Sequence, residues 1–158
     1  MKKAVINASP IISLCKIGVE NILFELFEKV FITDEVIGEI DSKPGRMSNF
    51  IKDSIAIGKL KKYSVAKKSM IDDLYGKMHK GELSVVIAGL ELQADYVIID
   101  EIAARNFAES LSLNPIGTIG LLRIAKKKGL IQSVKPFLME LREKGMWLSK
   151  QIIEKIIK

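Results

Sequence analysis

Oxygen-bearing side chains lie beside apolar runs of the chain at four places: Asn7, Glu39, Glu82 and Asp100. Three of the four are acidic, and carboxylates that are brought together without a basic partner repel one another. A divalent cation removes this repulsion, because hard ions such as Mg²⁺ and Mn²⁺ prefer oxygen ligands. If the four side chains meet in one cleft, the sequence predicts metal-assisted phosphodiester chemistry.

The elements that must position these residues are strands alternating with helices. Apolar, β-branched runs predict strands at 3–6, 30–32, 60–65, 96–99 and 114–116. Helical spacing predicts helices at 11–18, 20–27, 34–40, 50–57, 82–92, 101–111, 118–128, 136–144 and 149–157. The polar segment 67–80 is expected to be irregular apart from one helical turn. This alternation predicts an α/β fold, a three-layer α/β/α arrangement around a central, mostly parallel sheet.

The predicted strands also suggest where a site would form. In open parallel sheets, ligands bind outside the carboxyl ends of the strands. Asn7 and Asp100 each follow a predicted strand, so both are expected at that edge. Glu82 begins a predicted helix, and Glu39 lies more than one turn into another, so their approach depends on how the helices pack.

Capping residues predict where three of the helices begin. Ser9-Pro10 predicts an N-cap at Ser9 followed by proline at the first helical position. Thr33 or Asp34 is expected to cap the next long helix, and Gly117-Thr118 is expected to open a later one.

Length and composition indicate a soluble protein. At 158 residues, without a repeat, linker or low-complexity tract, the chain is expected to form a single domain over 1–158. Its one cysteine, Cys15, rules out an intramolecular disulfide framework and is expected to be a small buried hydrophobe. No uncharged stretch approaches the roughly 18 residues that span a bilayer, and the first residues do not resemble a signal peptide. We therefore expect no membrane association and a cytoplasmic location.

Positive charge is concentrated in the C-terminal part, which is predicted to be helical. The net charge of +6 divides into +7 for residues 123–158 and −1 for residues 1–122. A basic surface beside an acidic cleft would hold a polyanion near a metal ion. Lysine runs also occur on solvated helix faces, and charge alone does not distinguish the two.

Five segments, taken in order, resemble the PIN-domain family of metal-dependent nucleases, which includes VapC-type toxins. They are Val-Ile-Asn-Ala-Ser-Pro at 5–10, Val-Ile-Gly-Glu-Ile at 36–40, His-Lys-Gly-Glu-Leu-Ser at 79–84, Ala-Asp-Tyr-Val-Ile-Ile-Asp-Glu at 94–101 and Gly-Thr-Ile-Gly-Leu-Leu at 117–122. The resemblance spans nearly the whole chain. Within the family, the chain most resembles a mainly archaeal branch of PIN-like proteins. Each segment is weakly specific alone, and their order and spacing carry the resemblance.

The resemblance implies a site and a function. It places the family's four acidic positions on Asn7, Glu39, Glu82 and Asp100, with its small hydroxyl residue on Ser9. Glu39, Glu82 and Asp100 would be catalytic, and all four would hold one or two Mg²⁺ or Mn²⁺ ions. Asn7 stands where the family has aspartate; it can offer a carbonyl oxygen but no charge, so weaker metal affinity is expected.

By the same resemblance, the chain would be a Mg²⁺- or Mn²⁺-dependent endoribonuclease, as the toxin of a toxin–antitoxin pair. RNA would be its substrate, an antitoxin would occlude the acidic cleft, and the protein would form a homodimer. The alternative is a PIN-like nucleic-acid-binding or regulatory protein with little catalysis, because the missing charge at Asn7 can leave the metal site empty. The dimer interface could be formed by Met146-Trp147-Leu148 together with the C-terminal apolar stripe, Ile152, Ile153, Ile156 and Ile157. Alternatively, the C-terminal helix covers the domain's own sheet.

Each candidate residue also has a purely structural interpretation. Asp100 could cap the helix that follows it, Glu82 could favour a helix N-terminus, and Asn7 could bond to its own turn. Glu39 could be a solvated helix residue.

Two further residues are candidates for substrate binding together with Ser9. Arg105 could contact a phosphate, although its spacing from Glu101 also predicts an exposed ion pair on one helix face. Thr118 could belong to an anion site at a helix start or could simply cap that helix.

Overall fold

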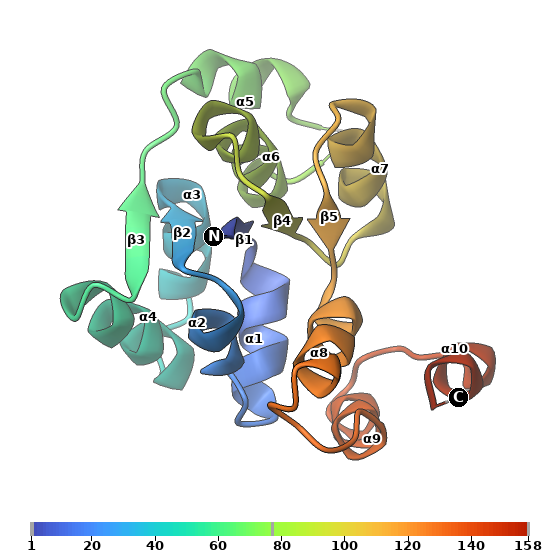
Figure 1. The fold of residues 1–158 in the computed structure, drawn as a ribbon. Helices are drawn as coiled ribbons and strands as arrows, with labels where there is room; N and C mark the ends of the chain where they lie inside the picture. Colours follow the sequence, from blue (N-terminus) through green and yellow to red (C-terminus); the bar gives the residue numbers. More distant parts are fainter. Residues whose placement is uncertain (1, 77, 158) are drawn as a thin grey trace.

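The computed structural model describes residues 2–76 and 78–157; the side chain of Ile157, part of the predicted C-terminal stripe, lies outside the described portion. A parallel sheet of five strands forms its centre (Figure 1). The strands are β1 (Lys3–Ile6), β2 (Lys29–Thr33), β3 (Leu60–Tyr63), β4 (Tyr96–Ile98) and β5 (Pro115–Ile116), in the spatial order β3-β2-β1-β4-β5.

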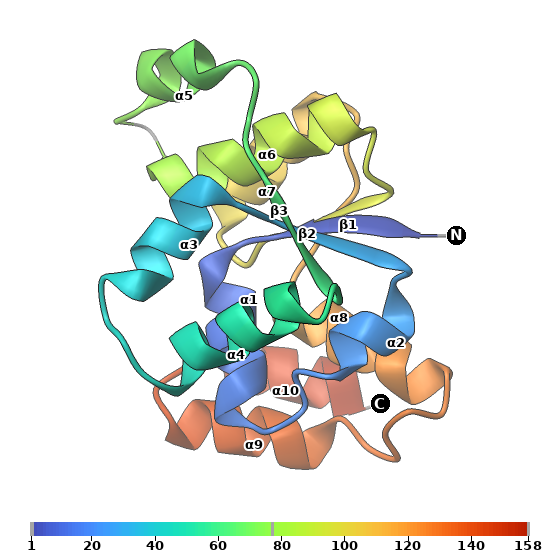
Figure 2. The same ribbon diagram turned by 90° about the vertical axis from the view of Figure 1, so that its left-hand side faces the viewer.

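Ten helices connect and follow the strands within the described residues. They are α1 (Ala8–Lys16), α2 (Ile22–Leu26), α3 (Asp34–Asp41), α4 (Arg46–Ala56), α5 (Lys68–Leu74), α6 (Lys80–Leu92), α7 (Ile102–Ser110), α8 (Thr118–Lys127), α9 (Lys135–Glu143) and α10 (Lys150–Ile157). Helices α6 and α7 cover one face of the sheet, and α1, α2, α4 and α8 cover the other (Figure 2). The predicted three-layer α/β/α class is confirmed, with a sheet that is parallel throughout.

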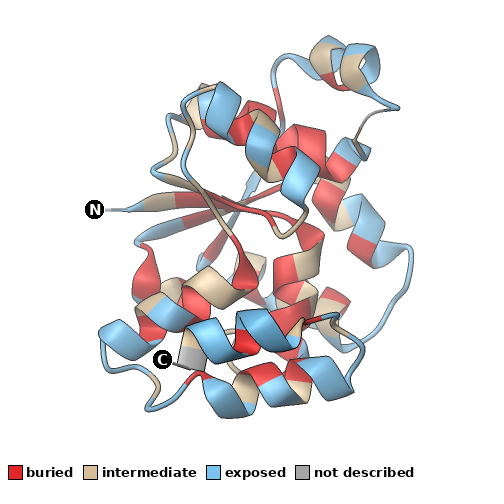
Figure 3. Ribbon diagram, turned by 90° about the vertical axis from the view of Figure 1, so that its right-hand side faces the viewer, coloured by how far each residue is buried: buried red, intermediate tan, exposed pale blue. Residues whose placement is uncertain are grey.

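The core lies on both faces of the sheet, as expected for a parallel sheet that is covered by helices. The three strands β1, β2 and β4 contribute residues with no exposed surface, among them Val5, Ile32 and Val97. Figure 3 shows this buried centre between outer helices whose surfaces are largely exposed. No helix of the described residues is both long enough and apolar enough to cross a membrane.

Strand β1 lies in the middle of the sheet and determines where a site can form. It pairs with β2 on one side and with β4 on the other, both in parallel. The helices that follow β1 and β4, α1 and α7, cover opposite faces of the sheet, so a crevice is expected at the carboxyl ends of these two strands (Figure 2). The backbone N–H of Asn7, just after β1, donates to the Ile98 carbonyl at 2.9 Å and fixes the two strand ends together.

Two local predictions were wrong. The N-cap of α1 is Asn7, with extended backbone angles, instead of Ser9. The Asn7 side chain makes no capping hydrogen bond. Pro10 is still tolerated because N–H groups of a first helical turn have no intrahelical partner. Segment 68–74 forms the full helix α5, because Ile71 is buried where this helix packs on α6.

Other helix starts agree with the capping predictions. Thr33 caps α3 by accepting the Val36 N–H at 3.2 Å, and α8 begins at Thr118. Strand β3 is an edge strand, as predicted, and its Lys61 and Lys62 are exposed.

Candidate active site

Asn7 lies at the centre of the crevice and is almost fully buried. Its side-chain amide donates to Oε2 of Glu101 at 3.5 Å, and the Ser9 hydroxyl donates to Oε1 of the same carboxylate at 3.1 Å. The start of α1 therefore orients Glu101, which is the N-cap residue of α7.

The side-chain oxygen of Asn7 has no hydrogen-bond partner, although it is buried. A buried carbonyl oxygen without a donor is uncommon in folded proteins and calls for an explanation. The amide cannot simply be reversed, because this would turn its oxygen toward the Glu101 carboxylate, which only accepts hydrogen bonds. The lone pairs of Asn7 Oδ1 thus remain free in the crevice.

Gly81 provides the space into which this oxygen points. A Cβ atom at position 81 would stand 3.5 Å from Asn7 Oδ1 and only 2.6 Å from Glu39 Oε2. Two oxygens from different parts of the chain, the N-cap of α1 and helix α3, therefore converge on one small region above a bare backbone. Any residue larger than glycine would fill that region.

Helices α3 and α6 are joined by a chain of buried hydroxyl groups. Ser84 donates to the Gly81 carbonyl at 2.6 Å, and the Ser84 and Thr33 hydroxyls lie 2.7 Å apart. Because Ser84 has one proton and uses it on Gly81, Thr33 is the donor between the two hydroxyls. This chain fixes the helix that carries Glu39 relative to the helix that carries Glu82.

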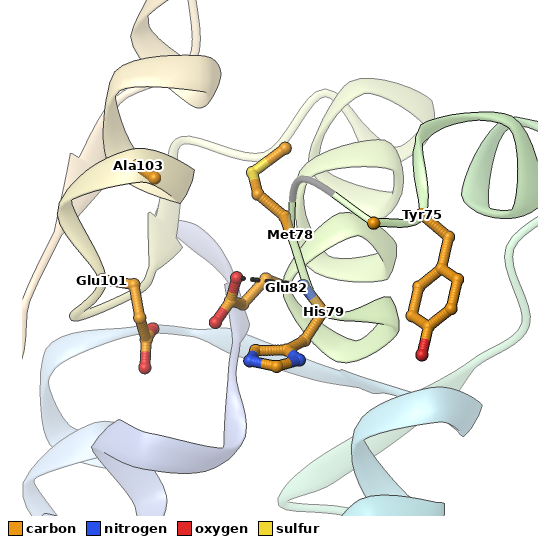
Figure 4. A pocket seen from close by; sticks show the side chains of 7 residues that line it. Tyr75, Met78, His79, Glu82, Glu101 and Ala103 are labelled. Carbon is orange, nitrogen blue, oxygen red and sulfur yellow. Dashed lines mark hydrogen bonds between the residues drawn. The ribbon is translucent and has the colours of Figure 1, made fainter.

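Glu82 is buried in the first turn of α6. Figure 4 shows its carboxyl group facing that of Glu101 across a pocket of 530 Å³, with His79 beside them. Burial raises the pKa of Glu82, and the negative charges of Glu101 and Glu39 add to this effect. The backbone N–H of His79 donates to Oε2 of Glu82 at 3.4 Å and lowers the pKa. The three carboxylates thus act on one another electrostatically.

Asp100 follows β4, as predicted, but its carboxylate faces α8. One oxygen accepts the backbone N–H of Thr118 at 2.7 Å and the other accepts its hydroxyl at 2.8 Å. Burial nevertheless raises the pKa of Asp100, and the nearby charge of Glu101 raises it further. Asp100 therefore caps α8, and the structural interpretation that it caps the helix directly after it is wrong.

Arg105 lies beside Asp100 across another glycine. A Cβ on Gly117 would stand 3.0 Å from Asp100 Oδ1 and 3.5 Å from Arg105 Nη1. Within the described part of the chain, Arg105 forms no ion pair with Glu101, so the exposed pair predicted by their spacing is absent. Thr118, in contrast, is fully buried, and both of its donors are used by Asp100.

A family model described as a PIN domain matches residues 3–158. The chain belongs to the PIN-domain family. PIN domains are generally nucleases and generally depend on divalent metal ions, which supports a nuclease-type role. No protein of curated function matches the chain in sequence.

The four metal ligands expected in this PIN domain do not form one tight group. Across residues 2–76 and 78–157, no three carboxylate, imidazole or thiol groups lie close enough to hold an ion. Asn7 and Glu39 converge at Gly81, Glu82 lies nearby with Glu101, and Asp100 is turned toward Thr118.

The residues nevertheless fit a divalent ion. The donor set consists of hard oxygens, one of which is buried without a partner, and Gly81 leaves a space that a side chain would fill. These features are seen in the geometry of the chain itself and do not depend on the family match.

Glu101 is a residue of the site whose importance was not predicted from the sequence. It contacts Asn7 and Ser9, and it raises the pKa of both Glu82 and Asp100. Its spacing from Arg105 suggested an ordinary surface pair, whereas its place three residues beyond β4 was the stronger signal. Neighbouring residues after a strand point in different directions, so Asp100 faces α8 and Glu101 faces β1.

Proposed function

We propose that this PIN domain is a metal-dependent ribonuclease, with its active centre formed by Asn7, Glu39, Glu82, Glu101 and Asp100. The observation that carries the proposal is the partnerless Asn7 oxygen, which meets the Glu39 carboxylate over Gly81 at the carboxyl edge of the sheet. Such an arrangement leaves an acceptor unsatisfied unless a cation or a donor from a ligand completes it.

Asn7 and Glu39 would hold the ion directly, and Glu82 and Glu101 would complete its oxygen ligands. A bound Mg²⁺ or Mn²⁺ would polarise a phosphate oxygen and lower the pKa of a bound water. Asn7 and Ser9 keep Glu101 in place through their hydrogen bonds. Asp100, held by Thr118, adds negative charge to the same edge of the sheet.

Glu82 is the residue best suited to accept a proton from the attacking water. Burial and neighbouring charges raise the pKa of Glu82 in the absence of metal, and a bound cation would lower that pKa again. Glu82 would then act as a carboxylate base on a water whose own pKa the ion lowers. No histidine is required for this step, in keeping with a chain that contains only His79.

Cleavage of a labelled RNA in the presence of Mn²⁺ tests the proposal. We expect Glu82→Gln to lower the cleavage rate by about 100-fold or more, the usual effect of losing a general base, and Glu101→Gln to lower it strongly as well. Glu109→Gln is the matched control, because Glu109 is exposed on α7 away from the crevice. If Glu82→Gln and Glu109→Gln cleave equally fast, the assignment of the active centre is wrong.

A second candidate function is nucleic-acid binding with little catalysis. It is favoured by Asn7, which brings no charge, and by the Asp100 carboxylate, whose two oxygens are already occupied by Thr118. Calorimetric titration of Mn²⁺ into wild type and Asn7→Asp distinguishes the two functions. Binding to both proteins supports the nuclease, whereas binding to Asn7→Asp alone supports the second function.

Other expectations from the sequence stay predictions. They are the choice of RNA, the toxin role, the antitoxin partner and the homodimer.

A further inference from the structure

A second cavity has a volume of 590 Å³ and lies between α7, α8 and the C-terminal segment that includes Trp147. Asp100 and Arg105 form part of its wall. The cavity therefore shares Asp100 with the proposed active centre, while most of its lining comes from apolar side chains.

Trp147 is the most notable of those side chains. It is 81% exposed, and Ile102, at 73%, is exposed in the same cavity wall. Large aromatic side chains are usually covered when no partner is needed, and exposed apolar patches mark binding sites. The face of an indole ring is also a surface on which an unpaired nucleobase can stack.

Basic side chains continue the cavity along α8. Arg123 lines it and also lines an adjoining cavity of 300 Å³, together with Lys126 and Lys127. These residues are three and four positions apart, so they lie close together on the helix surface. Within the described part of the chain, none of these three residues forms an ion pair.

The charge in these two cavities is almost entirely positive. Asp100 is the only acidic residue among the described residues that line either one. A surface that alternates an aromatic face with unpaired cations suits a chain of bases and phosphates better than a protein segment. A duplex would not fit the same way, because its bases are stacked on one another.

We propose that this groove, formed by Arg105, Arg123, Lys126, Lys127 and Trp147, binds the single-stranded part of the substrate next to the bond that is cut. One base stacks on Trp147, and the cationic side chains bind the phosphates that lead away from Asp100. The inference rests on the proposed nuclease function, since the groove shares Asp100 with that centre. It adds a binding site that the acidic residues do not contain.

Trp147 is the only tryptophan of the chain, so its fluorescence reports on this groove alone. The test titrates a single-stranded oligoadenylate into Glu82→Gln protein without divalent metal, so that binding is measured apart from cleavage. We expect saturable quenching of tryptophan emission, with no quenching by an abasic oligonucleotide of equal length. Absence of quenching, or equal quenching by the abasic strand, would overturn the proposal.

Two sets of variants test the residues. Trp147→Ala should weaken binding, measured by anisotropy of a labelled strand, by about 5- to 150-fold, the range for removing one base–aromatic stack; Trp147→Phe should restore most of it. Arg123→Gln/Lys126→Gln/Lys127→Gln should make the plot of log binding constant against log salt concentration less steep. Its slope should fall in magnitude by about 0.7 for each phosphate that the protein no longer neutralises. Lys52→Gln/Lys61→Gln, exposed residues of α4 and β3, is the control.

The outcomes separate the groove from the nuclease function. Binding through Trp147 without any cleavage by wild-type protein would support the groove and contradict the nuclease. If Trp147→Ala cleaves RNA as fast as wild type and binds the single strand as tightly, the result would contradict the groove alone. Emission that shifts with protein concentration, without nucleic acid, would show that a second copy covers Trp147 and would also overturn the proposal.

Discussion

The carboxylate of Asp100 accepts two hydrogen bonds from Thr118, at 2.7 Å from its backbone N–H and 2.8 Å from its hydroxyl. Both oxygens are thereby used to hold the start of α8 against the end of β4. The contact joins two segments on which the proposed centre and the proposed groove both depend.

Thr118→Val should destabilise the protein by about 1–3 kcal/mol, because a buried carboxylate oxygen loses its donor. The backbone N–H remains, so the helix should still form. Urea denaturation measures the free energy of unfolding. Thr118→Ser keeps the hydroxyl and should lose much less stability. Equal stabilities of the valine and serine variants would contradict the assigned role of the hydroxyl.

Gly81→Ala should weaken Mn²⁺ binding without lowering stability. The new Cβ would stand 2.6 Å from Glu39 Oε2, and this exposed carboxylate can turn away, so that it leaves the site. Alanine is a better helix former than glycine by up to about 1 kcal/mol. Calorimetry measures the affinity and urea denaturation the stability.

Gly38→Ala is the control for this change. Gly38 also lies within a helix, and a Cβ there would meet nothing within 4 Å. It should gain stability and bind Mn²⁺ like wild type. If both alanine variants bind Mn²⁺ like wild type, Glu39 does not hold the ion at Gly81.

Glu82→Gln should raise the melting temperature at pH 7 when divalent metal is removed with EDTA. The pKa of Glu82 is raised above its ordinary value of 4.5, chiefly by burial, so folding disfavours its charged form. The stability that this group contributes is present at low pH and is lost as the pH rises through its pKa in the folded protein. The advantage of the glutamine variant should therefore shrink as the pH falls toward 4.5, as thermal melts followed by circular dichroism would show.

Metal should reverse this difference at pH 7. A bound cation favours the charged form of Glu82, so Mn²⁺ should stabilise wild type more than Glu82→Gln. Equal stabilisation of both proteins by Mn²⁺ would show that Glu82 does not contribute to the metal site.

Cys15 should resist alkylation in the native protein. It is buried, and desolvation, together with the negative charge of Glu20, raises its pKa to about 11, so almost no reactive thiolate forms at pH 8. Labelling with iodoacetamide, followed by mass spectrometry, should be slow until urea unfolds the protein. Rapid labelling of the native protein would contradict the packing of α1.

The edge of the sheet at which the site lies could be predicted from the sequence, because Asn7 and Asp100 directly follow strands that are easy to recognise. The contact between Glu39 and the Gly81 region could not, because it depends on how α3 packs against α6. Glu101 was undervalued for a related reason. The direction of a side chain in a turn follows from backbone angles, and the types of the neighbouring residues do not specify these angles.

The prediction for α5 failed for a different physical reason. Segment 68–74 is mostly polar, so its local pattern is weak, and burial of Ile71 against α6 decides its conformation. Tertiary packing overrides local preference most easily where that preference is small.

The position of β1 in the middle of the sheet bears on how the protein is made. Asn7 is synthesised before Glu101, which is 94 residues later, and Asp100 is synthesised before its partner Thr118. A nascent polypeptide in which Glu101 and Thr118 have not yet left the ribosome holds no finished centre. On the proposed function, a growing chain would spare its own messenger until the segment up to Thr118 had emerged.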